Sequence, residues 1–326
     1  MRCLATTSVV LALLAGVGAA TADESFRYID GPVPSVKAGA IVVDSRPLAA
    51  CQARSIDGAR CLPSATFLGP HRRLAALPDI LWALGTAGLT GEETAVVVGE
   101  EPSARDFVAG ILYLAGQRQV AILRAPVSLL RDSFGPGTPR GMVRESVFRA
   151  PVRDHLWVLR GELAARLAGG PPPMLLDGRT ESEFWGETVR AARGGHLPGA
   201  ESLPTSSVRA AMARGETVGP FAGEPVAYAH DVVDGVAFFT LLRAGAGISA
   251  RLYPGGWAEW SSDGTLPADA ATYPDRAGSA SRTEARPATL ASPVWLSLVA
   301  ATLLGAILAA GGFYVGRRTL RGGGRA

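Results

Sequence analysis

Three side chains that could bind a metal ion or transfer a proton lie close together in the sequence, at His230, Asp231 and Asp234. Imidazole and carboxylate groups are common ligands of zinc, and a catalytic zinc site needs three protein ligands. The residue types suit a metal, but the sequence does not identify a third protein ligand, and the chain contains only four histidines. We therefore expect a solvated loop without metal or cofactor. A receptor for a small anion or a metal at this loop is kept as an alternative.

Cys51 and Cys61 are the residues that could form a covalent bond with each other. The third cysteine, Cys3, lies in an N-terminal leader, so an even pair remains in the rest of the chain. A disulfide that closes so short a loop would contribute about 3 kcal/mol to stability. Two buried, reduced thiols fit the sequence equally well, and both states stay open.

The N-terminus indicates export. Residues 1–22 combine Arg2, an apolar run over residues 9–20 and a small-residue cleavage site at Ala20 and Ala22. The apolar run is shorter than the ~20 residues that span a bilayer, which favours a cleaved signal peptide over the alternative of an uncleaved anchor.

The C-terminus indicates a membrane anchor. Residues 294–315 contain no charged residue, and the tail 316–326 contains four arginines and no acid. At about 1.5 Å per residue, such a helix would cross a bilayer. Because positive residues stay on the cytoplasmic side, we expect a cytoplasmic C-terminus and an exported, periplasmic body. Residues 268–292, rich in Ala, Ser, Thr, Arg and Pro, are expected to form a flexible stalk.

The charge balance argues against a nucleic-acid partner. Of the 32 basic residues, five lie in the two end segments, which leaves 27 against 29 acidic residues between them. A slightly acidic body offers no surface that would follow a phosphate backbone. The partners we expect are the membrane, through the C-terminal helix, and a protein in the periplasm or the membrane.

An internal repeat organises the exported part. The segment Ile-Val-Val-Asp-Ser-Arg at 41–46 recurs as Met-Leu-Leu-Asp-Gly-Arg at 174–179. The repeat continues through turns at 58–63 and 199–204, apolar strands at 95–98 and 225–228, amphipathic helical stretches at 105–115 and 235–244, and short strands at 120–123 and 250–253. Apolar strands that alternate with helices predict parallel sheets buried on both faces. We expect two α/β domains, 24–132 and 145–267, joined by a linker at 133–144.

The second repeat resembles the tandem-domain rhodaneses, the thiosulfate and 3-mercaptopyruvate sulfurtransferases. Asp177, Arg179, His196 and Gly199 occur in segments similar to the family pattern D-x-R, E-F-x-G, G-H-I-P-G-A and L-P. Residues 255–260, Gly-Gly-Trp-Ala-Glu-Trp, are similar to its G-S-W-x-E-W segment. The resemblance spans about 38–267 and implies two rhodanese-like domains, each a mainly parallel sheet flanked by helices.

The motif residues have structural interpretations of their own. Asp177 and Arg179 follow a strand, where such a pair ties loops together by charge-assisted hydrogen bonds. His196 precedes a turn that ends at Gly199, and we expect it to form a structural hydrogen bond. Trp257, in the segment that also contains Glu259, is expected to pack in the core.

The resemblance places a catalytic cysteine where this chain has Ala229. In the family, a thiolate carries the sulfur as a persulfide, within a C-x-x-G-x-(R/K/T) loop whose backbone N–H groups hold the anion. Here the glycine position is Val232 and the cationic or hydroxyl position is Asp234. The loop from Ala229 to Asp234 therefore lacks the thiol, the flexible glycine and the positive potential of the family pattern. Its other three residues are His230, Asp231 and Val233.

These departures predict a degenerate site. We expect a membrane-anchored, exported binding or scaffolding module without catalytic residues, associated with sulfur compounds or envelope redox work. An active thiosulfate or mercaptopyruvate sulfurtransferase is the alternative that the family name suggests.

Overall fold

The computed structural model describes residues 25–30, 39–130 and 134–269, which belong to one compact unit. The predicted signal peptide, membrane span and tail, and the stalk beyond residue 269, lie outside these residues. Within the described part of the chain, no helix combines the length and apolarity needed to cross a bilayer.

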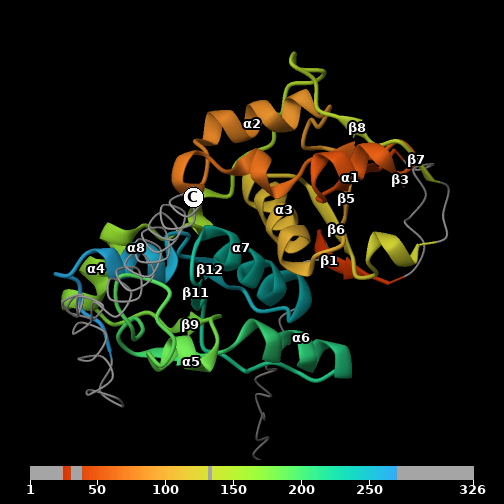
Figure 1. Ribbon diagram of the computed structural model, residues 1–326. Helices are drawn as coiled ribbons and strands as arrows, with labels where there is room; N and C mark the ends of the chain where they lie inside the picture. The colour runs from red at the N-terminus through yellow and green to blue at the C-terminus, as the bar shows by residue number, and fades with distance from the viewer. Residues whose placement is uncertain (1–24, 31–38, 131–133, 270–326) are drawn as a thin grey trace, which may run out of the picture. The chain divides into compact units, whose positions relative to one another are not determined.

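The first sheet contains six parallel strands (Figure 1). Their order is β1 (Phe26–Ile29), β6 (Gln119–Leu123), β5 (Thr94–Val98), β2 (Ile41–Asp44), β4 (Arg60–Cys61) and β8 (Thr138–Pro139). Its helices are α1 (Leu48–Ala53), α2 (Leu77–Thr86) and α3 (Pro102–Ala115), with 3-10 turns at Ser64–Phe67, Pro70–Arg72 and Val127–Leu129. A separate antiparallel pair joins β3 (Ser55–Ile56) to β7 (Phe134–Gly135).

The second sheet contains four parallel strands in the order β10 (Ala200–Ser202), β9 (Leu175–Asp177), β11 (Val226–Tyr228) and β12 (Arg251–Leu252). The helices here are α4 (Arg160–Gly169), α5 (Glu181–Phe184), α6 (Thr205–Arg214), α7 (Val232–Thr240) and α8 (Gly256–Ser262). A π-helical turn at Leu241–Gly245 continues α7, and a 3-10 turn at Asp154–Leu156 precedes α4. The expectation of mainly parallel sheets flanked by helices is confirmed.

The strands are buried on both faces, as their continuous apolar sequences predict. In β5, Ala95 and Val97 face one core, and Val96 and Val98 face another. This alternation follows from the two-residue period of a strand. Parallel strands covered on both faces are typical of α/β folds.

A shared core joins the two sheets, and α3 and α7 form its centre. The inner face of the first sheet contributes Val43, Ala95, Val97, Val120 and Ile122, and that of the second contributes Leu176, Ala227 and Leu252. Figure 1 shows α3 and α7 side by side. The helices touch at Gly110, where a side chain would collide with Val236 and Thr240. Every residue of α3 from Arg105 onward is buried, so the stretch predicted to form an amphipathic helix is a helix that is covered on all sides.

The predicted linker pairs with strands of the first repeat. Residues 138–139 join the first sheet next to β4, and residues 134–135 pair with β3 in the separate antiparallel pair. Beyond it, the backbone N–H groups of Glu145 and Arg149 donate to Gly85 and Thr90 of the first sheet's domain. The chain reaches the second sheet only near Val158, whose N–H donates to Leu252. The boundary therefore lies near residue 154, and we call residues 25–153 the first domain and 154–269 the second domain.

The predicted stalk also begins later than expected. The backbones of Asp269 and His196 form a two-bond antiparallel bridge, with N···O distances of 2.9 and 3.1 Å. Ala268 packs against the outer core of the second sheet. These two residues belong to the domain because their backbone hydrogen bonds and apolar contacts are satisfied there.

Candidate functional site

Both domains have a hydrogen-bonded Asp–Arg pair at the end of a central strand. In the second domain, Arg179 donates through Nε and Nη2 to Asp177, at 3.0 and 2.6 Å, and its Nη2 also donates to the Gly195 carbonyl at 2.9 Å. In the first domain, Arg46 donates to Asp44 at 2.7 Å and to the Arg54 carbonyl at 2.6 Å. Bidentate pairs of this kind fix the loop that follows each strand. The motif residues Asp177 and Arg179 thus form a buried ion pair, and their structural role stays a prediction.

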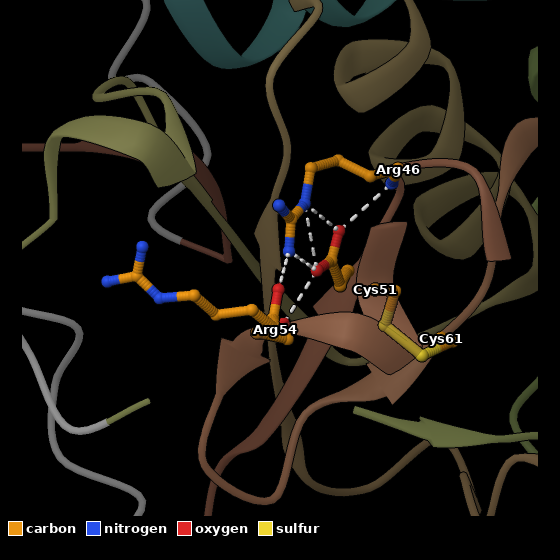
Figure 2. The surroundings of a disulfide bond; sticks show 6 residues. Arg46, Cys51, Arg54 and Cys61 are labelled. Carbon is orange, nitrogen blue, oxygen red and sulfur yellow. Dashed lines mark hydrogen bonds and ion pairs between the residues drawn. A yellow bond between two sulfur atoms is a disulfide. The ribbon is translucent and has the colours of Figure 1, made fainter. Parts of the chain in front are cut away.

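A disulfide lies beside the Asp44–Arg46 pair of the first domain. Figure 2 shows the Cys51–Cys61 bond and the Arg46 side chain directed at the carbonyl of Arg54. The bond links α1 to β4, with a Cα–Cα distance of 5.8 Å. Gly137 passes directly over the two sulfur atoms, so no larger residue fits there. Of the two states that the sequence leaves open, the structure has the bonded one.

The segment 229–234 does not form an exposed loop. Ala229 is only 2% exposed and follows β11 directly. Its carbonyl accepts the N–H of Trp257 at 2.8 Å, and the His230 carbonyl accepts the N–H of Ala258 at 2.9 Å. Gly256 has φ +59°, and a side chain there would lie 2.6 Å from the Ala229 carbonyl. The glycine of the Gly-Gly-Trp segment is therefore needed for this close approach, a role that the sequence interpretation missed.

Asp231 caps the N-terminus of α7. Its Oδ1 accepts the backbone N–H groups of Val233 and Asp234, at 2.9 and 3.1 Å. The helix begins at Val232, three residues earlier than predicted, because this cap satisfies its first free N–H groups. An aspartate directly before an apolar helical pattern is a recognised start signal, and it could have placed this boundary.

His230 and Asp234 lie close to two other charged side chains, those of Glu183 and Arg190. His230 Nδ1 lies 3.7 Å from Glu183 Oε1, which also accepts from Arg190 at 3.1 Å. Burial raises the pKa of Asp234, and the neighbouring Asp231 carboxylate raises it further. Within residues 25–30, 39–130 and 134–269, no group of three acidic, histidine or cysteine residues is arranged to hold a metal.

The remaining motif residues support the core. His196 is 5% exposed, stacks on Phe184 with ring centroids 3.7 Å apart, and its Nδ1 lies 3.0 Å from the Phe184 carbonyl. Gly199 has φ +71° in the turn before β10. Trp257 donates to the Arg193 carbonyl at 2.9 Å, and Glu259 accepts from Tyr253 at 2.8 Å. We interpret these as packing and turn residues.

A cleft of about 820 Å³ opens beside the capped helix. One wall is formed by Asp231 and Val232 together with the start of α8. The facing wall comes from residues 71–74 of the first domain. The sequence interpretation did not bring these first-domain residues to the site, because nothing local in the sequence indicates which loop faces which.

Together, the two parallel sheets, the Asp–Arg pair after a central strand of each and the Gly-Gly-Trp segment define a rhodanese-like fold. A comparison with models of protein families finds no match. Among curated proteins, the chain is 31% identical over 178 residues to SseB of Mycobacterium tuberculosis, whose name assigns it to the thiosulfate sulfurtransferases. The match covers 48% of this chain and 60% of that relative, so it spans well under two thirds of the relative's length.

Solved structures show the same fold. A crystal structure described as a thiosulfate sulfurtransferase is 27% identical, with a TM-score of 0.51, over 71% of this chain and 97% of that one. The anaerobic ergothioneine biosynthesis enzyme of Chlorobium limicola has a TM-score of 0.57 at 20% identity, over 71% of this chain and 64% of that one. At that identity, the second likeness concerns the fold alone. The named relatives point to a function related to sulfur chemistry.

Proposed function

We propose that this protein is a binding module of rhodanese-like fold that does not transfer sulfur through its second domain. The observation that supports this proposal is the carboxylate of Asp231 at the N-terminus of α7. A helix N-terminus is the natural place to hold an anionic substrate or a thiolate. In this chain the protein's own negative charge takes that place.

Sulfur transfer would also need a nucleophile next to this helix. The side chain of Ala229 is a methyl group and forms no persulfide, because only a thiolate attacks the outer sulfur of a donor. Asp231 and Asp234 add negative charge where thiosulfate would approach, which repels it. The raised pKa of Asp234, caused by burial and by Asp231, reflects this crowding of carboxylates.

The framework around the missing nucleophile remains intact, which favours binding over loss of all function. The Asp177–Arg179 pair fixes the loop after β9, the strand beside β11, and the contact of Gly256 with Ala229 holds the 229–234 segment in place. The cleft beside it stays open, so a ligand or a protein segment can reach it. We propose that the partner is a protein near the membrane, concerned with sulfur compounds or envelope redox work.

The test of the catalytic question uses the full chain, purified in detergent. It is incubated with thiosulfate and cyanide, and thiocyanate is measured. We expect the rate to equal that of a heat-denatured control. Thiocyanate release well above that control would refute the proposal and favour an active sulfurtransferase.

We further propose that residues 1–22 direct export and that residues 294–315 anchor the chain with its C-terminus in the cytoplasm. The support is the uncharged apolar segment followed by four arginines. Protease added to spheroplasts should remove the body and leave a small C-terminal fragment with the membrane. Full protection of the body would exclude this topology.

A further inference from the structure

We infer that the cleft between the two domains is a binding site for a small organic acid with two or more negative charges. The inference deepens the proposed function, on which it rests, by naming the class of ligand. The arginines that line the cleft are Arg72 and Arg73 of the first domain and Arg160 at the start of α4. None of them belongs to the 229–234 segment.

The side chains of Arg72, Arg73 and Arg160 form no hydrogen bond or ion pair with another residue that the structure describes. Arg160 lies near enough to Asp263 to lower the pKa of that carboxyl, but the two side chains are not paired. Arginine matches carboxylate and phosphate groups with its planar fork of donors. Three such groups line the cleft against two carboxylates, Asp231 and Glu259, so the charge of the lining is positive on balance.

The loop that presents Arg72 and Arg73 is held in an unusual backbone conformation. His71 and Arg72 have φ of 56° and 57°, and among the described residues they are the only non-glycine positions with positive φ. The hairpin is closed by a hydrogen bond of 2.8 Å from Gly69 N–H to the Arg73 carbonyl and by a bridge between Leu68 and Leu74. Left-handed non-glycine residues are costly, persist only where their surroundings fix them, and gather at ligand sites.

The acidic residues of the cleft are occupied by internal partners. Asp231 accepts two backbone N–H groups of α7 through Oδ1. Glu259 accepts the Tyr253 hydroxyl at 2.8 Å. The three lining arginines, which have no such partners, are therefore the groups left to meet the anionic groups of a ligand.

The size of the cleft and the apolar side chains in its lining favour an organic ligand over an inorganic sulfur oxyanion. A volume of about 820 Å³ is that of sites for organic molecules. Leu74, Val158 and Pro254 line it between the charged residues. An organic body in contact with these side chains, with acidic groups directed at Arg72, Arg73 and Arg160, fits this arrangement.

The test is calorimetric titration of the full chain in detergent with citrate, phthalate and phenyl phosphate, with acetate and thiosulfate for comparison. We expect at least one of the three organic polyanions to bind, more tightly than acetate or thiosulfate, and more weakly as salt is added. Binding should weaken at least about tenfold in Arg73→Gln and in Arg72→Asn, since each loses a charge-assisted contact. Asparagine is used at position 72 because it tolerates the left-handed backbone.

The matched control is Arg118→Gln, an exposed arginine outside the cleft that pairs with Glu92. It should bind as the unmodified chain does. Equal affinity in all three variants, or no binding of any organic polyanion, would overturn the inference. Thiocyanate release together with polyanion binding would refute only the proposed function, whereas neither activity nor binding would refute only this inference.

Discussion

Asp106 of α3 and Arg209 of α6 form an ion pair between the two domains, with Arg209 Nη2 2.6 Å from Asp106 Oδ2. The Asp106 side chain is fully buried, and Arg105 Nε lies 3.2 Å from its other oxygen. Burial, followed by the charge of Asp106, raises the pKa of the neighbouring Tyr28 well above its ordinary value. The ion pair ties the second domain to the central helix of the first.

Removing the arginine from this pair should destabilise the chain. Arg209→Met keeps much of the volume but removes one of the two arginines that lie against Asp106. Loss of one partner of a buried pair costs about 3–5 kcal/mol, and we expect about 2–3 kcal/mol because Arg209 is a quarter exposed. Urea unfolding measures it. Arg214→Met, in the same helix and paired only with the exposed Glu216, is the control and should change nothing measurable; equal losses would contradict the assignment.

The crossing of α3 and α7 leaves no space at Gly110. In Gly110→Ala, the new methyl group would meet Val236 and Thr240 of α7. Overpacking of a core costs about 1–3 kcal/mol, although alanine favours a helix. Gly169→Ala, where nothing lies within 4 Å, should leave stability unchanged or raise it. Thermal unfolding of both variants tests this contact, and a stabilised Gly110→Ala would show that the helices are further apart.

Loss of the disulfide should weaken the first domain. The bond closes a loop with a sequence separation of 10. The double variant Cys51→Ala, Cys61→Ala should therefore lose about 3 kcal/mol of unfolding free energy. Dithiothreitol should lower the stability of the unmodified chain by a similar amount and leave the double variant unaffected. Insensitivity of both proteins to the reductant would mean that the cysteines are not bonded in solution.

A cysteine restored at position 229 should remain unreactive. In Ala229→Cys, the thiol would be buried beside the Asp231 carboxylate, and both effects raise its pKa. We expect slow alkylation by iodoacetamide at neutral pH and almost no thiocyanate formation. Adding Asp231→Asn should speed alkylation by freeing the helix N-terminus of charge. Strong sulfurtransferase activity from Ala229→Cys alone would show that the cap and Val232 matter little.

Asp234 should make the fold less stable as the pH rises. Its pKa is raised by burial and by Asp231, so the folded protein binds the proton more tightly than the unfolded chain does. The stability gained from this proton is full below the ordinary aspartate pKa and is lost as the pH rises through the folded value. Asp234→Asn should therefore be more stable than the unmodified chain at neutral pH, with the difference vanishing in acid.

The contribution of Asp263 to folding stability should change with pH in the opposite direction to that of Asp234. Hydrogen bonds from the Thr265 side chain and backbone lower its pKa. Its contribution is present above the ordinary aspartate pKa and is lost as the pH falls through the folded value. Asp263→Asn should weaken the fold at neutral pH and not in acid. If Asp234→Asn and Asp263→Asn changed the stability at neutral pH in the same direction, the opposite pKa shifts of the two aspartates would be contradicted.

Much of the fold could be predicted because apolar runs such as 95–98 and 225–228 repeat with one pattern. The strands that were missed lack that pattern. Phe26–Ile29 contains polar residues, and Thr138–Pro139 has only two residues. The boundary near residue 154 was also missed, because residues 145–153 are held by backbone hydrogen bonds to the first domain, which leave no trace in residue type.

By itself, the sequence determined the local chemistry: two domains with parallel sheets, an alanine where a related sulfurtransferase would have its thiol, and an aspartate two residues further along. Only the tertiary structure decided where those groups point. It placed the Asp231 carboxylate on the α7 N-terminus and brought Arg72 and Arg73 across from the other domain. Periodicity specifies which faces are buried. It does not specify which distant surfaces meet, because that depends on packing between segments far apart in the chain.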